Sequence, residues 1–188
     1  MEETLTWNFE RNPHMLITGR TGTGKTYLLN KMADYLSQVG VVSASFNKNG
    51  LAEILFLVQD EFKKRYEYIR KYCDGKSDAT YSELGMKPYF VLVDELDPQL
   101  LKLEREDLFS YEYLLQIIKN IVLKGRAVGI FLIVVCQGNK TFLEPMEDNF
   151  TTRIFLGAVK GNGTIFVDGN TEKFQTELVT EDFFFTDH

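Results

Sequence analysis

The sequence has few of the residues that build metal centres or disulfide frameworks. It contains only two cysteines and two histidines among 188 residues. Cys73 and Cys136 lie far apart and form no CxxC pair, and no companion histidines accompany them. We therefore expect neither a disulfide scaffold nor a zinc site, and a reducing compartment, the cytoplasm, is the default location.

Long hydrophobic runs are also missing. The longest strongly apolar run, 130–136, has seven residues, whereas a membrane-spanning helix needs about 20. The N-terminal residues, MEETLTWNFERN, are acidic and polar, which is not the pattern of a signal peptide. The chain as given is therefore expected to be soluble and cytoplasmic, and to reach a membrane only through a partner or a missing segment.

The chain lacks an excess of positive charge. Lysine and arginine number 21 and the acids 27, so the formal net charge is −6 and the pI is about 5.1. This balance argues against coating nucleic acid through bulk charge but leaves room for a local patch. One basic cluster with interleaved tyrosines has two interpretations, contact with a phosphate backbone or the solvated face of a long helix, and the second is favoured. Its residues are Lys63, Lys64, Arg65, Arg70, Lys71 and Lys76, with Tyr66, Tyr68 and Tyr72.

What remains is an ordinary globular composition, with 44% hydrophobic and 26% charged residues, in a length that suits about one domain. Short apolar runs alternate with helical periodicity, and the end of the chain reads as a hairpin between glycines. This alternation predicts an α/β fold with a mostly parallel sheet, helices on both faces and a C-terminal β-hairpin. The expected strands are 15–18, 41–46, 89–93, 129–136, 153–158 and 164–167, the expected helices 25–37, 51–72 and 111–123, and the expected loop 75–85.

The first motif is a glycine-rich loop between an expected strand and an expected helix. It fits the pattern GxxxxGK[ST], in which backbone N–H groups at a helix N-terminus cradle a di- or triphosphate. The sequence therefore predicts ATP binding, with Lys25 reaching the β- and γ-phosphates and the Thr26 hydroxyl holding Mg²⁺. The loop consists of Gly19, Arg20, Thr21, Gly22, Thr23, Gly24, Lys25 and Thr26. An arginine at the position of Arg20 is more often a surface residue than a catalytic one.

Two carboxylates follow the apolar run 89–93. Asp94 stands where a P-loop fold holds the Mg²⁺ shell, and Glu95 is the candidate base that orients and deprotonates the attacking water. The alternative is a solvated acidic loop, because Asp97 and Glu104 lie nearby. Gln137 ends the next buried run, at the edge where α/β sheets bind ligands. It is expected to contact the γ-phosphate or the water, unless it merely ends a strand.

Three segments in this order resemble a known family. They are Pro13–Gly19 leading into the P-loop, Glu61–Glu67 before the acidic strand, and Gly125–Ile130 before the strand that ends at Gln137. The pattern is similar to the motor domain of FtsK/SpoIIIE DNA translocases and their relatives in conjugative elements of Gram-positive bacteria. The resemblance implies a RecA-like P-loop NTPase fold, a hexameric ring, ATP hydrolysis and double-stranded DNA threaded through the ring.

The resemblance also implies a role for Arg153. The stretch Asn149–Ile154 resembles the family's Asn-x-x-x-Arg-Ile segment, whose arginine is expected to reach the nucleotide of the adjacent subunit. A local salt bridge to Glu147 or Asp148 is the alternative. The chain departs from the family at 46–50, where Asp-Pro-Lys-Gly is usual, and at Gly138-Asn139, where Arg-Pro is usual.

The expected organisation is an ATPase domain over 1–170 and an acidic, aromatic tail over 171–188, which either docks on a neighbour or folds back as an edge strand. DNA contacts are expected from the loops 138–140, including Lys140, and 75–85. Two other functions stay open. One is a conjugation or packaging ATPase that acts mainly on protein partners, and the other is a nucleotide-gated assembly module with little turnover, for which a water-activating carboxylate such as Glu95 is unnecessary.

Overall fold

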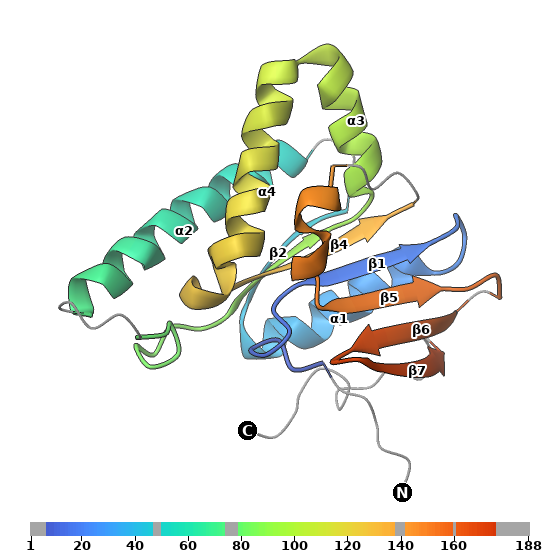
Figure 1. The fold of residues 1–188 in the computed structure, drawn as a ribbon, viewed down its shortest axis with the longest axis horizontal. Helices are drawn as coiled ribbons and strands as arrows, with labels where there is room; N and C mark the ends of the chain where they lie inside the picture. The colour runs from blue at the N-terminus through green and yellow to red at the C-terminus, as the bar shows by residue number, and fades with distance from the viewer. Residues whose placement is uncertain (1–6, 47–49, 74–78, 138–141, 160, 176–188) are drawn as a thin grey trace, which may run out of the picture.

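The computed structural model describes residues 7–46, 50–73, 79–137, 142–159 and 161–175. Within them, seven strands form one sheet in the order β2-β3-β4-β1-β5-β6-β7 (Figure 1). The strands from β2 to β5 run parallel, and β6 and β7 add an antiparallel extension. The strand bounds are β1 Met15–Gly19, β2 Val41–Ser45, β3 Tyr89–Val93, β4 Ile130–Cys136, β5 Thr152–Leu156, β6 Asn162–Val167 and β7 Asn170–Gln175.

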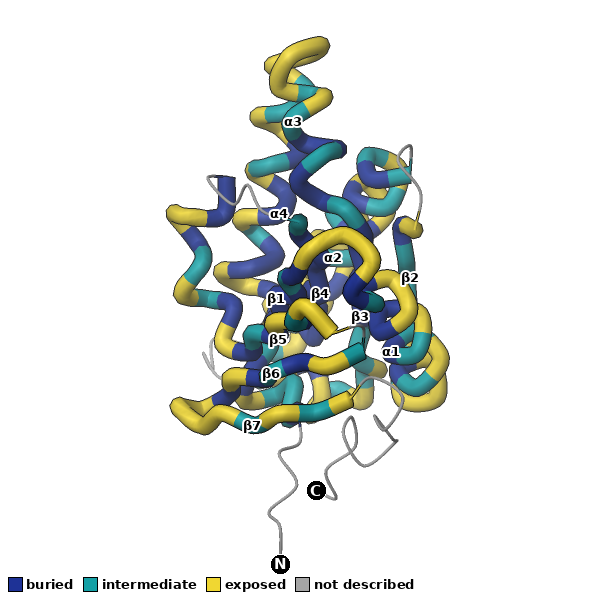
Figure 2. Tube along the Cα trace, turned by 90° about the vertical axis from the view of Figure 1, so that its right-hand side faces the viewer, coloured by how far each residue is buried: buried dark blue, intermediate teal, exposed yellow. Residues whose placement is uncertain are grey.

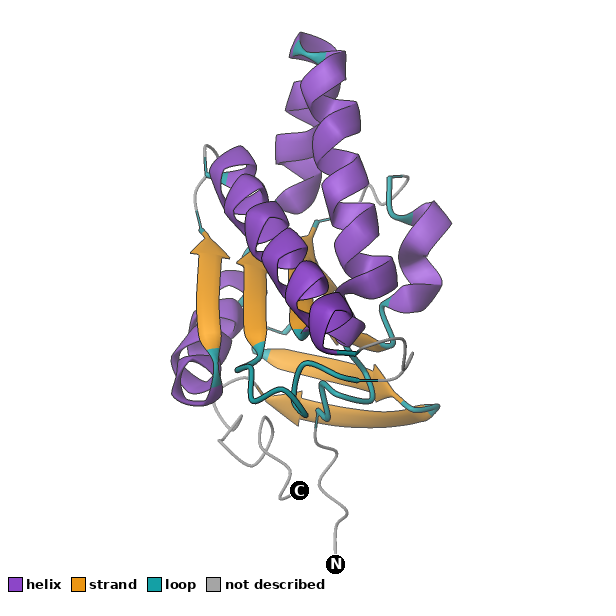
Figure 3. Cartoon of the chain, turned by 90° about the vertical axis from the view of Figure 1, so that its left-hand side faces the viewer, coloured by secondary structure: helices purple, strands orange, loops and turns teal. Residues whose placement is uncertain are grey.

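The helices cover both faces of the parallel part of this sheet. Helices α2 and α4 pack on one face, and α1 lies on the opposite face (Figure 3). Helices α3 and α4 run side by side and project beyond the sheet at the top of Figure 1. Their bounds are α1 Lys25–Val39, α2 Leu51–Tyr72, α3 Leu96–Glu106 and α4 Leu108–Val128, and a short 3-10 helix, η1, spans Glu144–Asn149.

Alternation along the strands divides the core between the two faces. In β4, Leu132 and Val134 pack under α2 and α4, while Ile133 and Val135 pack toward α1. All seven residues of β4 are buried, as expected for a central parallel strand covered on both sides. The polar residues that follow β4, β3 and β1 therefore stand at the ends of strands that are almost entirely buried (Figure 2).

The predicted fold class is confirmed, and two helical assignments need correction. The expected helix at 111–123 is longer, α4, and a further helix, α3, precedes it. Leu96, Leu100 and Leu103 have the i, i+4, i+7 spacing of an amphipathic helix, and Pro98 stands in the first turn, where proline is tolerated. No element was predicted for 96–106, and the nearby acids had suggested a loop only as an alternative. Asp107 separates α3 from α4, and its carboxylate accepts a hydrogen bond from Ser110 N as the N-cap of α4.

The expected hairpin is present as β5 and β6, and β7 extends it. Residues 171–175, expected to begin the tail, therefore lie in an edge strand. The remaining tail, 176–188, lies outside the described residues, so the division at residue 170 stays a prediction.

Arg65 corrects one interpretation of the basic cluster. Its side chain is buried, and it donates hydrogen bonds to Lys87 O, Val128 O and Gly129 O at 2.9, 3.2 and 3.3 Å and to the carboxylate of Glu61 at 2.8 Å. Arg65 therefore fastens α2 to the end of α4 and is not available to bind phosphate. The exposed members of the cluster, Lys63, Lys64, Arg70 and Lys71, form a solvated helix face, and Lys76 lies outside the described residues.

In the part of the chain that the structure describes, no helix is long and apolar enough to cross a lipid bilayer.

Candidate functional site

The candidate site forms where three strands end at one edge of the sheet. Strand β4 lies between β3 and β1, so the residue after β4 stands between the P-loop after β1 and the acidic pair after β3. Parallel pairing brings these carboxyl ends together although they are far apart in the sequence. The cavity between them has a volume of about 280 Å³ and is lined by Thr21, Gly22, Gly24, Lys25, Thr26, Tyr27, Asp94, Glu95 and Gln137.

Glycine is required in the P-loop at two positions for different reasons. Gly24 is the N-cap of α1 with a φ of 101°, a left-handed conformation that other residues rarely adopt. At Gly19 a β-carbon would lie 2.7 Å from Leu156 O and 2.9 Å from Thr23 Oγ1, so a side chain has no room. The loop thereby turns tightly into α1 and presents the first N–H groups of the helix to the cavity.

Lys25 is held inside this loop. Its ammonium donates hydrogen bonds to Gly19 O at 2.8 Å and Arg20 O at 2.9 Å, and the residue is only 6% exposed. These contacts neutralise little of its charge, because both acceptors are carbonyls. The cation therefore stands beside the cavity and is free to exchange carbonyl acceptors for phosphate oxygens. Arg20 itself is exposed.

Thr26 and Asp94 meet across the cavity. Thr26 Oγ1 donates a hydrogen bond to Asp94 Oδ2 at 2.6 Å. A hydroxyl and a carboxylate are oxygen donors of the kind that Mg²⁺ prefers, and Mg²⁺ in nucleotide sites takes few protein ligands beside water and phosphate. Among the described residues, no group of three or more histidines, cysteines or acids could hold a metal ion. The pair thus fits a magnesium ion that also needs phosphate oxygens.

Glu95 occupies a strained turn between β3 and α3. Its φ is 49° and its ψ is 50°, a left-handed conformation that costs a non-glycine residue about 1–3 kcal/mol and clusters at functional sites. Gln99 supports the turn, because its Nε2 donates to Asp94 O at 3.0 Å and to Glu95 O at 3.4 Å. The turn redirects the Glu95 side chain, so that Asp94 and Glu95, two adjacent residues that follow β3, both line the cavity.

Gln137 connects the acidic residue Glu95 to the P-loop. Its Nε2 donates to Glu95 Oε1 at 2.7 Å, and its Oε1 accepts from Thr21 Oγ1 at 3.3 Å. Its backbone N–H donates to both carboxylate oxygens of Asp97, at 3.2 and 3.1 Å. The structure therefore brings Gln137 together with the acidic pair and the P-loop, as the strand-end position predicts.

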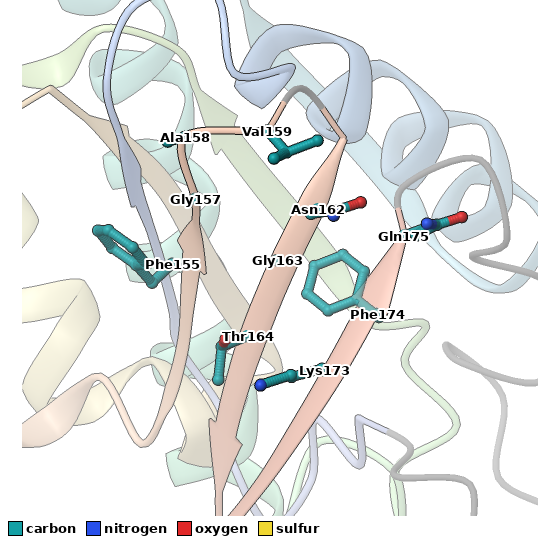
Figure 4. Close-up of a pocket in the computed structure, with 10 residues that line it drawn as sticks. All are labelled: Phe155, Gly157, Ala158, Val159, Asn162, Gly163, Thr164, Lys173, Phe174 and Gln175. Atoms are coloured by element: carbon teal, nitrogen blue, oxygen red, sulfur yellow. The ribbon is translucent and has the colours of Figure 1, made fainter.

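A larger concavity, of about 510 Å³, lies on the β5–β7 end of the sheet. Figure 4 shows it between Phe155 and Val159 on one side and Phe174 on the other. Gly161, which directly precedes β6, donates a backbone hydrogen bond to Thr23 O of the P-loop at 3.1 Å. Lys173 is its single formally charged side chain among the described lining residues, so the smaller cavity with Lys25 and the acids is the better candidate for phosphate chemistry.

Arg153 lies on β5 away from this cavity. It pairs with Leu16, the second residue of β1, rather than with the carboxyl end of that strand, where the P-loop begins. Its guanidinium donates to Glu147 O at 2.9 Å and Phe150 O at 3.1 Å, and its ion pairs to Glu147 and Asp148 are long, at 3.5 and 3.6 Å. The local contacts foreseen as the alternative are thus present, while the side chain remains 41% exposed. Its action on a neighbouring subunit stays a prediction.

Three residues at or beside the site were not among those predicted. Tyr27, which follows Thr26 on α1, lines the cavity. Asp97 was noted only as a nearby acid, and Gln99 was not considered; both are buried and both contact the strand ends. The amphipathic spacing that marks α3 was the available signal, since it places both residues in the first turn after Glu95. Of the predicted DNA-contacting loops, residues 138–140 and 75–78 lie outside the described residues, and Tyr81 in the remainder of the second loop is buried.

Comparison of the sequence with known proteins gives two matches. A family described as "Helicase HerA-like C-terminal" matches residues 1–69, which include the P-loop. The FtsK domain-containing protein YdcQ of Bacillus subtilis is 30% identical over 195 residues, covering 90% of this chain and 39% of that protein. The chain thus spans well under half the length of this curated relative.

Comparison with solved structures gives the same fold. The pCW3 conjugation coupling protein TcpA, in a monomer form with ATPγS, superposes with a TM-score of 0.71 at 19% identity, over 90% of this chain and 61% of that one. EssC (ATPases 2 and 3) of Geobacillus thermodenitrificans gives 0.66 at 14% identity, over 90% and 41%. The type VII secretion ATPase EccC of Thermomonospora curvata gives 0.66 at 18% identity, over 87% and 25%.

The fold and the site define a class, the proteins with a P-loop NTPase fold. The strand order and the P-loop before α1 are those of this fold, which the solved structures named above share. Within it, the resemblance read from the sequence is confirmed: the chain is related to motor domains of the FtsK/SpoIIIE type.

Proposed function

We propose that the chain is an ATP-hydrolysing motor domain that couples hydrolysis to the translocation of double-stranded DNA. The observation that carries the proposal is the closed set of contacts around one cavity, in which the P-loop, Asp94, Glu95 and Gln137 meet. A module that only bound nucleotide would need the loop and the metal pair. It would not need a carboxylate held in a strained turn beside them.

The proposed steps follow from the side chains. The P-loop N–H groups and Lys25 bind the β- and γ-phosphates, and Thr26 and Asp94 hold Mg²⁺, which would neutralise the charge that develops on the phosphate oxygens. Glu95 accepts a proton from a water as that water attacks the γ-phosphorus. The bond to the bridging oxygen breaks, and the products are ADP and inorganic phosphate. Gln137 holds the Glu95 carboxylate in place and contacts the water or the γ-phosphate.

Assembly is part of the proposal. Arg153 is 41% exposed and lies away from the cavity of its own chain, which suits a residue that serves the nucleotide of a neighbour in a homo-oligomeric, hexameric ring. An arginine supplied between subunits is worth about 10³–10⁵ in rate in well-studied P-loop enzymes. We place this work in the cytoplasm, with the membrane reached through partners.

DNA binding would have to be local. A net charge of −6 repels a polyanion at long range, so contact must come from a ring lumen or a loop. The loops 138–140 and 75–85 remain the candidates, with Lys140 as the cation of the first. Such contacts would be independent of sequence and would weaken with salt, at a slope of about −0.9 for each phosphate neutralised.

Action on protein partners is the second candidate function. Two observations favour it: the acidic charge balance, and the equal structural similarity to EssC and to EccC, the latter described as a secretion ATPase.

ATPase rates measured with and without double-stranded DNA, at two salt concentrations, separate these functions. A translocase is stimulated by DNA, and less so at the higher salt. Glu95→Gln should keep ATP binding and stop turnover, which also distinguishes an enzyme from an assembly module. If DNA neither binds at low salt nor stimulates the assembled protein, the translocase function is wrong and action on protein partners takes its place.

A further inference from the structure

The first turn of α3 is fastened to the end of β4 by one buried carboxylate. Asp97 is 4% exposed, and both of its carboxylate oxygens accept a hydrogen bond from the backbone N–H of Gln137, at 3.2 and 3.1 Å. A carboxylate suits this position for two reasons. It offers two acceptors to one donor, and the N-terminus of a helix favours negative charge.

This contact completes a small ring of linked residues within one chain, formed by Glu95, Asp97 and Gln137. Asp97 follows Glu95 by two positions, Gln137 N binds Asp97, and Gln137 Nε2 returns to Glu95 Oε1 at 2.7 Å. Because the ring contains only the short stretch 95–97 and Gln137, the residue that follows β4, the position of the Gln137 side-chain amide depends on where Asp97 holds the Gln137 backbone. The Glu95 carboxylate in turn depends on that amide, since Gln137 is a hydrogen-bond donor to it.

We propose that Asp97 is a positioning residue for ATP hydrolysis, which acts through Gln137 to hold Glu95 in place for its water. The inference rests on the proposed function, since it assigns a role in the same reaction. Asp97 is not among the residues that line the nucleotide cavity, and the hydrogen bonds of Lys25 and Thr26 described above go to Gly19 O, Arg20 O and Asp94. The loss of Asp97 should therefore slow turnover and leave ATP affinity unchanged.

The test compares Asp97→Asn with the matched control Asp107→Asn. Asp107 is also an acid at the start of a helix in the same helical pair, but it is exposed and caps α4. Asparagine at 97 keeps the volume but turns an N–H donor or a single oxygen toward the Gln137 N–H. We expect kcat to fall about 10- to 100-fold, as for a misplaced catalytic group, with the affinity for ATP and Mg²⁺ within twofold of wild type and the control unchanged in both.

A second comparison separates positioning from general loss of structure. If Asp97 acts through Gln137, the double variant Asp97→Asn/Gln137→Ala has the same kcat as Gln137→Ala alone. Multiplying effects would mean that Asp97 acts independently, and would overturn the inference. Should Asp97→Asn unfold, Asp97→Glu retains the charge and moves it by one methylene, and the same fall in kcat at constant ATP affinity is expected.

Hydrogen exchange of the Gln137 amide, in the nucleotide-free protein, tests the contact without turnover. Exchange at Gln137 should be at least tenfold faster in Asp97→Asn than in the Asp107→Asn control, and equal rates would overturn the inference. The two proposals fail differently. A wild-type protein that does not hydrolyse ATP refutes the proposed function, whereas an active wild type matched in kcat by Asp97→Asn refutes only the role of Asp97.

Discussion

Removing the charge of Lys25 is the sharpest single perturbation of the nucleotide site. Without nucleotide, the ammonium donates to Gly19 O and Arg20 O at 2.8 and 2.9 Å. Binding exchanges these neutral acceptors for phosphate oxygens, so the gain is about that of one charge-assisted hydrogen bond, roughly 1.5–3 kcal/mol. At about 1.4 kcal/mol for each factor of ten, Lys25→Ala should weaken ATP binding by about 10- to 150-fold.

Titration of a fluorescent ATP analogue in the presence of Mg²⁺ measures this loss, and a phosphate-release assay should show turnover falling at least as far. Lys119→Ala is the matched control, because Lys119 is an exposed lysine of α4. Thermal unfolding of both variants shows whether the P-loop stays folded once Gly19 O and Arg20 O lose their donor. A Lys25→Ala protein with unchanged ATP affinity and hydrolysis would refute the assignment of this loop.

Three other expectations concern assembly, pH and packing. Mixing Arg153→Ala subunits with Glu95→Gln subunits should restore ATP hydrolysis at some interfaces, and full activity of Arg153→Ala alone would contradict action between subunits. Burial lowers the pKa of His14 from 6.5 to about 4, and His14 accepts a hydrogen bond from Leu132 N. As the pH falls below about 6.5, the unfolded state therefore binds the proton before the folded state does. The free energy of unfolding, measured with denaturant, should fall by about 2 kcal/mol between pH 7 and pH 5. His14→Asn, which keeps an acceptor, should lack this loss. Arg65→Met should lower the free energy of unfolding by roughly 3 kcal/mol, because three carbonyls lose a buried donor, whereas Lys63→Ala should change it by less than about 0.5 kcal/mol.

The local elements of the site could be read from the sequence because their causes are local. The P-loop needs glycines with particular backbone angles before a helix, and the run 89–93 is apolar enough to be a buried strand that ends at Asp94. Periodicity of 3.6 residues predicted α2 with its observed bounds, 51–72. Periodicity also existed in α3, but no helix was predicted there, and the structure shows α3 packed against α4.

Tertiary structure decided which of these elements meet. Nothing in the sequence states that β4 lies between β3 and β1, and this order alone puts Gln137 within hydrogen-bond distance of both Glu95 and Thr21. Tertiary structure also decided which residues of one basic run are buried and which are exposed. Arg65 and Lys64 are neighbours in one basic run, yet the α-helical period turns Arg65 toward the carbonyls at the end of α4 and leaves Lys64 in solvent. A charge pattern gives the sign of a surface, whereas the fold decides which charges remain on it.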